Sequence, residues 1–148
     1  MILELRLLNC FWLMIPLLAW NLALGPRITQ EQITSDSHSP AWLLNCENIT
    51  RILVFALPLL LPLQWKETWS KAGLAIYLIG TLVYFASWLP LLLAPGSTWS
   101  QSAAGLLAPR LTPFLPFLGI ALIGQSWPYG LVSAVFIFLH TWHGIQNL

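Results

Sequence analysis

The chain has 148 residues, of which 57% are hydrophobic and 7% are charged, whereas an average globular domain has about 25% charged residues. Such a composition excludes a soluble globular protein, because lipid must replace water around most of the surface. The formal net charge is +1 and no basic stripe is present, which excludes nucleic-acid binding through phosphate contacts.

We therefore predict one all-α domain over residues 1–148, a polytopic transmembrane bundle of about five helices. The clearest span is 72–94, with 23 residues and no charge, because a helix needs roughly 20 apolar residues to cross a bilayer. The predicted spans are 5–24, 40–63, 72–94, 103–124 and 128–146.

The first predicted span, 5–24, follows a basic residue, as a signal peptide also would. We interpret it as a retained helix, because Pro26 would stand directly after the apparent cleavage site. Gly25 and Pro26 are expected to end this helix, since proline lacks an amide donor and glycine commonly stops helices. The hydrophilic segment 27–39 is expected to lie in water.

The second predicted span, 40–63, should begin with Ser39 as the N-cap and Pro40 at the first helical position. Pro58 and Pro62 are expected to weaken its last turns. Tryptophan and lysine residues over 64–71 are typical of the membrane interface.

The fourth predicted span, 103–124, contains Pro109, Pro113 and Pro116. Internal prolines break or kink helices, so we predict a broken helix, with a re-entrant hairpin as the alternative. Ser126 precedes the last span, 128–146, as its expected N-cap.

The positive residues near span ends predict the orientation. With a cytoplasmic N-terminus, the inner side carries Arg6, Lys66 and Lys71, and the outer side carries Arg27, Arg51 and, at a span end, Arg110. The acidic residues of 27–39 would also lie outside. We therefore expect a multi-pass protein of the cell membrane with its N-terminus inside and its C-terminus outside.

Five antiparallel crossings bring the polar intramembrane residues together at one end of the bundle. Polar groups in a membrane are costly unless they pair or face a cavity, so this concentration predicts a polar pocket that opens to the outer face. The candidate ligand-binding residues are Glu47, Asn48, Arg51, Tyr84, Ser87, Arg110 and His140.

Two interpretations are open for the charges of this end. Glu47 and Arg51 are four residues apart, the spacing of an ion pair along one helix, or they mark the aqueous end of the second span. Arg110 either snorkels to the interface or pairs with Glu47. We predict that Glu47 pairs with Arg51 or Arg110.

The histidines of the last span are three residues apart and share one side of the helix. Two nitrogen ligands are incomplete for zinc, although Glu47 or His38 could complete the set. We predict no metal, with His140 and His143 as the candidate ligands if one were bound. His140 should face the interior, with Asn21, Glu47 or Tyr84 as its partner, while His143 should lie in the headgroup zone beside Trp142.

A stripe of small and hydroxylated residues runs along 72–94. Such stripes either bring helices together or line a cavity. Its members are Gly73, Tyr77, Gly80, Tyr84 and Ser87.

Three function classes fit these features. The first is a binding or accessory subunit for a lipid-like or small ligand, which nothing in the chain contradicts. The second is a membrane enzyme at the outer face, with Glu47 or His140 as acid or base and Arg51 or Arg110 holding an anionic group such as a lipid phosphate. The third is a small transporter, ranked last because the inner half offers few polar groups. The expected partners are the lipid bilayer and a membrane protein or second copy of the chain, and no cofactor is identified.

Overall fold

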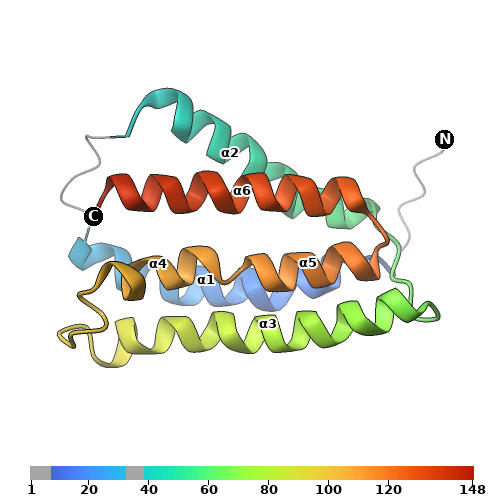
Figure 1. Cartoon of the computed structure of the whole chain (residues 1–148), viewed down its shortest axis with the longest axis horizontal. Helices are drawn as coiled ribbons and strands as arrows, with labels where there is room; N and C mark the ends of the chain where they lie inside the picture. Colours follow the sequence, from blue (N-terminus) through green and yellow to red (C-terminus); the bar gives the residue numbers. More distant parts are fainter. Residues whose placement is uncertain (1–7, 33–38) are drawn as a thin grey trace.

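The computed structural model describes residues 8–32 and 39–148, which form the predicted all-α bundle. Helices α4 and α5 follow one another along one line, so that the bundle has five rods (Figure 1). In chain order the elements are α1 (Phe11–Gln32), α2 (Ala41–Ala56), the 3-10 helix η1 (Leu57–Leu60), α3 (Thr68–Leu93), α4 (Ala103–Leu111), α5 (Phe114–Ile123) and α6 (Trp127–Gln146).

Four helical stretches are long and apolar enough to cross a membrane, as expected of a multi-pass membrane protein. They are Phe11–Ile28, Ala41–Leu60, Thr68–Leu93 and Ala103–Ile123. Helix α6 has 20 residues and lies along the bundle (Figure 1). It is not among the four stretches named above, so its membrane crossing stays a prediction.

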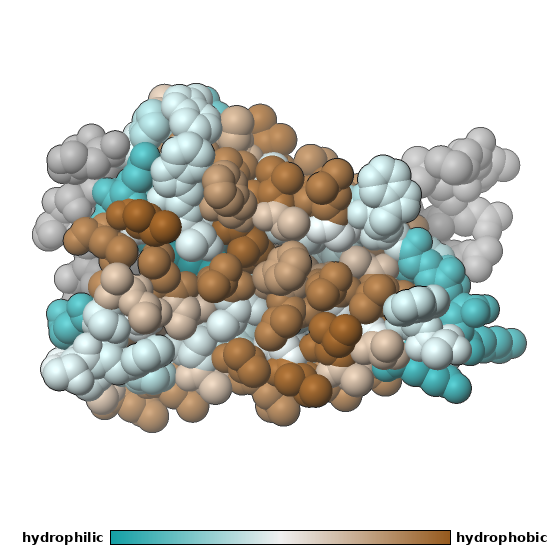
Figure 2. Space-filling model, in the orientation of Figure 1, coloured by the Kyte–Doolittle hydropathy of each residue, from teal (hydrophilic) through white to brown (hydrophobic). Residues whose placement is uncertain are grey.

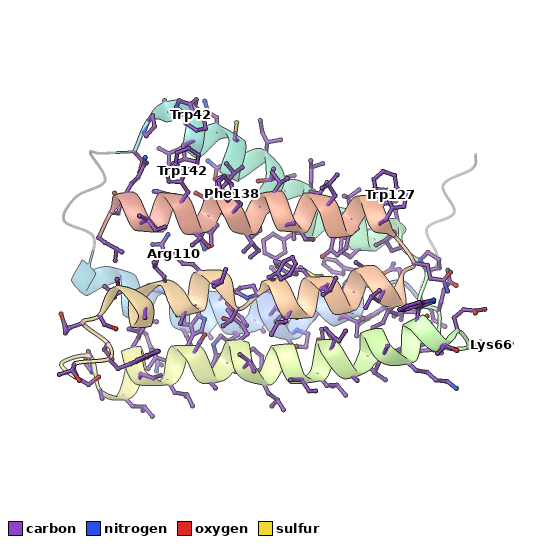
Figure 3. All side chains as sticks on the ribbon, in the orientation of Figure 1. Trp42, Lys66, Arg110, Trp127, Phe138 and Trp142 are labelled. Carbon is purple, nitrogen blue, oxygen red and sulfur yellow. The ribbon has the colours of Figure 1, made fainter. Side chains whose placement is uncertain are left out.

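The surface of the bundle has the apolar belt that lipid contact requires. Hydrophobic side chains cover the middle of the face in Figure 2, while hydrophilic ones gather toward the two ends. Exposed tryptophans lie near both ends, with Trp127 at one end and Trp42 at the other (Figure 3). Trp65 precedes the start of α3 and Trp99 follows its end. Indole rings favour the headgroup level, so these residues mark the two edges of the belt.

The helices alternate in direction as predicted. Figure 1 shows the ends of α1, α3 and α6 and the starts of α2 and α4 at the left, beside the C-terminus. We call this the C-terminal end of the bundle. It is where the sequence predicts the polar pocket.

The first helix differs from its predicted bounds. It begins at Phe11, whose amide donates to Asn9 Oδ1 at 3.0 Å, and it continues through Gly25 and Pro26 to Gln32. Proline within a helix removes one hydrogen bond, and its ring also restricts the preceding residue through that residue's Cβ. Gly25 has no Cβ, which lessens this restriction. The predicted stop was therefore wrong, and residues 33–38 of the hydrophilic segment lie outside the described residues.

The second helix begins one residue later than predicted. Pro40 occupies the N-cap position without a side-chain cap, and Ser39 Oγ instead accepts a hydrogen bond from Asn147 Nδ2 at 3.2 Å. The expected Ser39 cap was wrong because the hydroxyl is engaged by the end of α6. The proline effect was predicted correctly, since the α-helix becomes the 3-10 helix η1 at Leu57 and Pro58.

The small-residue stripe of α3 is a packing face. A Cβ added to Gly80 would lie 2.6 Å from Leu115 Cβ of α5, and one added to Gly119 would lie 2.6 Å from the Tyr77 amide nitrogen of α3. These separations are too short for real side chains, so the two backbones approach closely only because both positions are glycine. Helices α3 and α5 form the most extensive helix pairing of the bundle.

The fourth rod is broken, as its prolines predict. Helix α4 ends at Leu111 and α5 begins at Phe114, with Thr112 and Pro113 between them. Thr112 donates to Ala108 O twice, through its amide at 3.0 Å and through Oγ1 at 2.8 Å. Ser126 Oγ accepts from the Tyr129 amide at 3.3 Å and caps α6, as predicted.

Candidate functional site: a buried carboxylate between α2 and α6

Glu47 lies on the buried face of α2. The buried residues of this helix are Leu43, Glu47 and Val54, whose spacing follows one helical stripe. Because α2 packs against α6, Glu47 is only 1% exposed. A carboxylate so placed must be compensated by hydrogen bonds or by opposite charge.

Two imidazoles of α6 provide part of this compensation. His140 Nδ1 lies 2.9 Å from Glu47 Oε1, and His143 Nδ1 lies 2.6 Å from Glu47 Oε2. A carboxylate accepts hydrogen bonds, so both rings carry a proton on Nδ1. In a neutral imidazole this leaves the Nε2 lone pair unprotonated, and neither Nε2 has a hydrogen-bond partner in the described part of the chain.

Arg51 provides the third contact. Its Nη2 donates to Glu47 Oε1 from the next turn of α2, and its Nη1 donates to Asn48 Oδ1 at 3.3 Å. The Arg51 side chain is 43% exposed, so it connects the buried carboxylate to the outside. We call Glu47, Arg51, His140 and His143 the Glu47 cluster.

The cluster confirms two predictions and overturns one. Glu47 pairs with Arg51, and His140 meets a carboxylate. His143 was expected beside the headgroups, but its side chain is 18% exposed against 25% for His140. The expectation was wrong because Glu47 has two carboxylate oxygens, and His143 Nδ1 hydrogen-bonds to the second one, Oε2, inside the bundle.

Glu47 and Arg110 lie within two of the candidate membrane spans, Ala41–Leu60 and Ala103–Ile123. Glu47 is six residues from the start of α2 and His140 six residues from the end of α6. At 1.5 Å per residue, each lies about 9 Å along its helix from the C-terminal end of the bundle. Arg110 of α4 lies about 10 Å from the same end by the same measure.

Arg110 reaches α6 through a gap left by a glycine. A Cβ added to Gly144 would lie 2.5 Å from Arg110 Cδ and 2.9 Å from Arg110 Nε. The guanidinium interacts electrostatically with Glu47 and Arg51. No carboxylate among the described residues lies within 4.0 Å of it. The predicted pairing of Arg110 with Glu47 is therefore a longer-range attraction without direct contact.

An apolar groove of about 450 Å³ runs between α6 and the α4 to α5 break. We call it the α6 groove. Seven of its eight lining residues are hydrophobic: Leu111, Phe114, Ala134, Ile137, Phe138, Trp142 and Ile145, with Thr141 as the eighth. Arg110 directly precedes Leu111 of the groove wall, and its side chain contacts Gly144, which directly precedes Ile145 of the same wall. The Arg110 side chain therefore lies beside the groove.

Two predicted site residues lie elsewhere. Tyr84 is 2% exposed and packs its ring against Trp88 at 5.9 Å. Ser87 Oγ lies 3.1 Å from Thr112 Oγ1 at the α4 to α5 break. Both belong to the packing of α3, and no contact links them to the Glu47 cluster. Tyr84 and Ser87 lie toward the same end of the bundle as the Glu47 cluster, but on a different side of it.

The structure adds three residues to the predicted site. Phe136 stacks on the His140 ring with centroids 5.4 Å apart, Gly144 makes room for Arg110, and Thr141 lines the groove. Gly144 was recognisable, because it lies four residues after His140 and therefore on the same side of the helix. Phe136 and the groove carry no distinguishing sequence signal.

No group of three His, Cys, Asp or Glu residues in the described ranges, 8–32 and 39–148, is arranged to hold a metal ion. His38, a predicted contributor, lies outside these ranges. The Nδ1 atoms of both imidazoles are already engaged with Glu47, and Arg51 is the cationic partner of the Glu47 carboxylate.

Comparisons of the chain with protein-family models, curated proteins and solved structures found no match. A function for this chain is therefore inferred from its own residues.

Proposed function

We propose that the chain is a membrane-embedded binding protein for a lipid-like amphiphile. The apolar part of the ligand lies in the α6 groove, and its polar group lies beside Arg110 and the Glu47 cluster. The supporting observation is that the apolar groove lies beside Arg110, which in turn interacts electrostatically with Glu47 and Arg51 of the cluster. Ligand sites combine mostly apolar walls with a few convergent polar groups, and their volumes of about 300–1,000 Å³ include that of this groove.

The cost of the polar cluster supports a ligand-binding role. A buried ion pair contributes little net stability compared with hydrophobic residues of the same volume. Ionisable residues inside membranes are by default candidates for function. The cluster contains four such residues held together by direct contacts, which is more than the packing of two helices requires.

A phospholipid with a photoreactive group at the end of its acyl chain tests the proposal. In nanodiscs, crosslinking should concentrate on peptides that contain groove residues of α5 and α6. Ala134→Phe fills the groove and should reduce this crosslinking about tenfold. Val135→Phe is the matched control, because Val135 is 42% exposed and does not line the groove. Crosslinks spread evenly over the outer face of α3 would contradict the proposal.

A membrane enzyme is the second candidate, favoured by one observation. Glu47 holds both imidazoles by Nδ1, and in their neutral form Nε2 remains available as a base. A base of this kind would accept a proton from a hydroxyl group or water at the ligand. Incubation with phospholipids should then give product with the parent and not with Glu47→Gln. Unchanged lipid in both samples would remove this candidate.

A further inference from the structure

We infer that the ligand is a phospholipid with net negative charge, whose acyl chain lies in the α6 groove and whose phosphate pairs with Arg110. This inference rests on the proposed function, since it names the class of amphiphile that the groove takes. It adds a preference for anionic headgroups and assigns that preference to one residue.

The charges around Arg110 leave room for an anion. Glu47 is the carboxylate of the cluster, and its two oxygens are already in contact with Arg51, His140 and His143. Two guanidinium groups therefore face one carboxylate, and Arg110 has no carboxylate within 4.0 Å in the described part of the chain. A guanidinium at membrane depth is costly without a counter-ion. A lipid phosphate is an anion available at the rim of the bilayer.

The position of Arg110 links this charge to the groove. Its side chain passes over Gly144, which lies on α6 between Thr141 and Ile145 of the groove wall. Figure 3 shows Arg110 between α4 and α6. At the same place Figure 2 shows a small hydrophilic area surrounded by hydrophobic surface. A ligand in the groove would thus have its chain against apolar walls and its polar end at the guanidinium.

The donors at this place suit phosphate oxygens. Arg110 offers only donors, in a planar arrangement that binds phosphate through two parallel hydrogen bonds. Thr141 is the polar residue of the groove wall, but its Oγ1 is buried, so Arg110 is the donor that we assign to the phosphate. A zwitterionic lipid would bring a cation toward Arg110 and Arg51, whereas an anionic lipid would not. The apolar walls favour a lipid over a free phosphate ion.

Native mass spectrometry of the full chain in detergent tests the inference. The protein is incubated with phosphatidylglycerol and phosphatidylcholine of identical acyl chains, and bound lipid is counted. The parent should prefer phosphatidylglycerol about tenfold, the ratio expected for one charge-assisted contact. Arg110→Gln should bind both lipids equally. Lys66→Gln removes an exposed cation at the other end of the bundle and should keep the parent's preference.

A second variant separates recognition from folding. Gly144→Ala keeps the charge of Arg110 but displaces its Cδ, which lies 2.5 Å from the added Cβ. It should lower the preference for phosphatidylglycerol as Arg110→Gln does. A preference that survives both substitutions, or that Lys66→Gln also abolishes, would overturn the inference. Displacement of phosphatidylglycerol by millimolar inorganic phosphate alone would overturn the assignment to a lipid.

Ala134→Phe distinguishes the inference from the function on which it rests. Loss of both lipids in Ala134→Phe, with equal binding of both by the parent, would overturn the anionic preference and leave the groove as a lipid site. Unchanged binding of both lipids in Ala134→Phe would overturn the proposed function itself. Reduced binding of both lipids in Ala134→Phe, with the headgroup preference lost only in the Arg110 and Gly144 variants, supports the proposed function and the anionic preference together.

Discussion

Glu47→Gln removes the charge at the centre of the cluster with little change in volume. The native carboxylate accepts from Arg51 and from two imidazole N–H groups, and its side chain is 2% exposed. A glutamine has one acceptor oxygen and an NH2 group, so it cannot accept from all three donors, and at least one imidazole must move its proton to Nε2 or face the NH2 group.

The expected loss is large. Each hydrogen bond to a charged group contributes about 1.5–3 kcal/mol, and removal of one partner from a buried pair costs about 3–5 kcal/mol. We therefore expect Glu47→Gln to lower the free energy of unfolding by about 3–5 kcal/mol. Replacing Glu47, Arg51, His140 and His143 together by apolar residues should cost less than Glu47→Gln alone, because no charge is then left unpaired.

Unfolding of the purified protein by sodium dodecyl sulfate, followed by tryptophan fluorescence, measures this difference. Glu67→Gln is the control, because Glu67 is an exposed carboxylate at the other end of the bundle. It should change the free energy by no more than about 1 kcal/mol. If Glu47→Gln were as stable as the parent, the reasoning about a buried, compensated carboxylate would be refuted.

Other predictions concern packing, thiol reactivity, capping and orientation. Gly119→Ala should cost about 1–3 kcal/mol in the same unfolding assay, because the added Cβ meets the α3 backbone, whereas Gly130→Ala, with ordinary contact at 3.5 Å, should be neutral or stabilising. Burial raises the pKa of the Cys10 thiol to about 12; since the reactive thiolate then forms only near that pH, Cys10 should react with maleimide at pH 8 only after unfolding. Labelling of Cys10 in the folded protein would count against this packing. Ser102→Ala should cost about 1 kcal/mol, because the Gly105 amide loses its cap; no change would show that the cap contributes nothing. Five crossings with a cytoplasmic N-terminus predict a C-terminal reporter active only outside the cell, and activity inside would contradict the crossing count or its orientation.

The all-α fold follows from features that sequence reasoning handles well. Long uncharged runs must be helical in lipid, because every backbone group has to be satisfied within its own segment. The break near Pro113 and the cap at Ser126 depend on local chemistry and were predicted correctly. The bounds of α1 and α2 were not, because the passage through Pro26 and the engagement of Ser39 by Asn147 depend on neighbouring residues and on another helix.

The site likewise has features that the sequence predicts and features that depend on which helices are neighbours. Alternating helix directions placed Glu47, Arg51, Arg110 and His140 at one end, and the structure brings these four into one region. Sequence periodicity fixes depth and helix face, but it does not say which helices are neighbours. Tyr84 was therefore included in the predicted pocket although α3 lies on the other side of α4 and α5 (Figure 1). The inward turn of His143 likewise follows from the α2 to α6 pairing, which sequence does not reveal.

The most direct test of the site is the nitrogen-15 NMR spectrum of the histidine rings in lipid nanodiscs. The signals of His140 and His143 can be assigned by single substitution. The account predicts a proton on Nδ1 of both rings, because each Nδ1 lies within 3 Å of a Glu47 oxygen (2.9 Å and 2.6 Å), and it predicts that Glu47→Gln removes this preference. Rings with a proton on Nε2 alone, unaffected by Glu47→Gln, would show that the carboxylate does not hold them and would contradict the account.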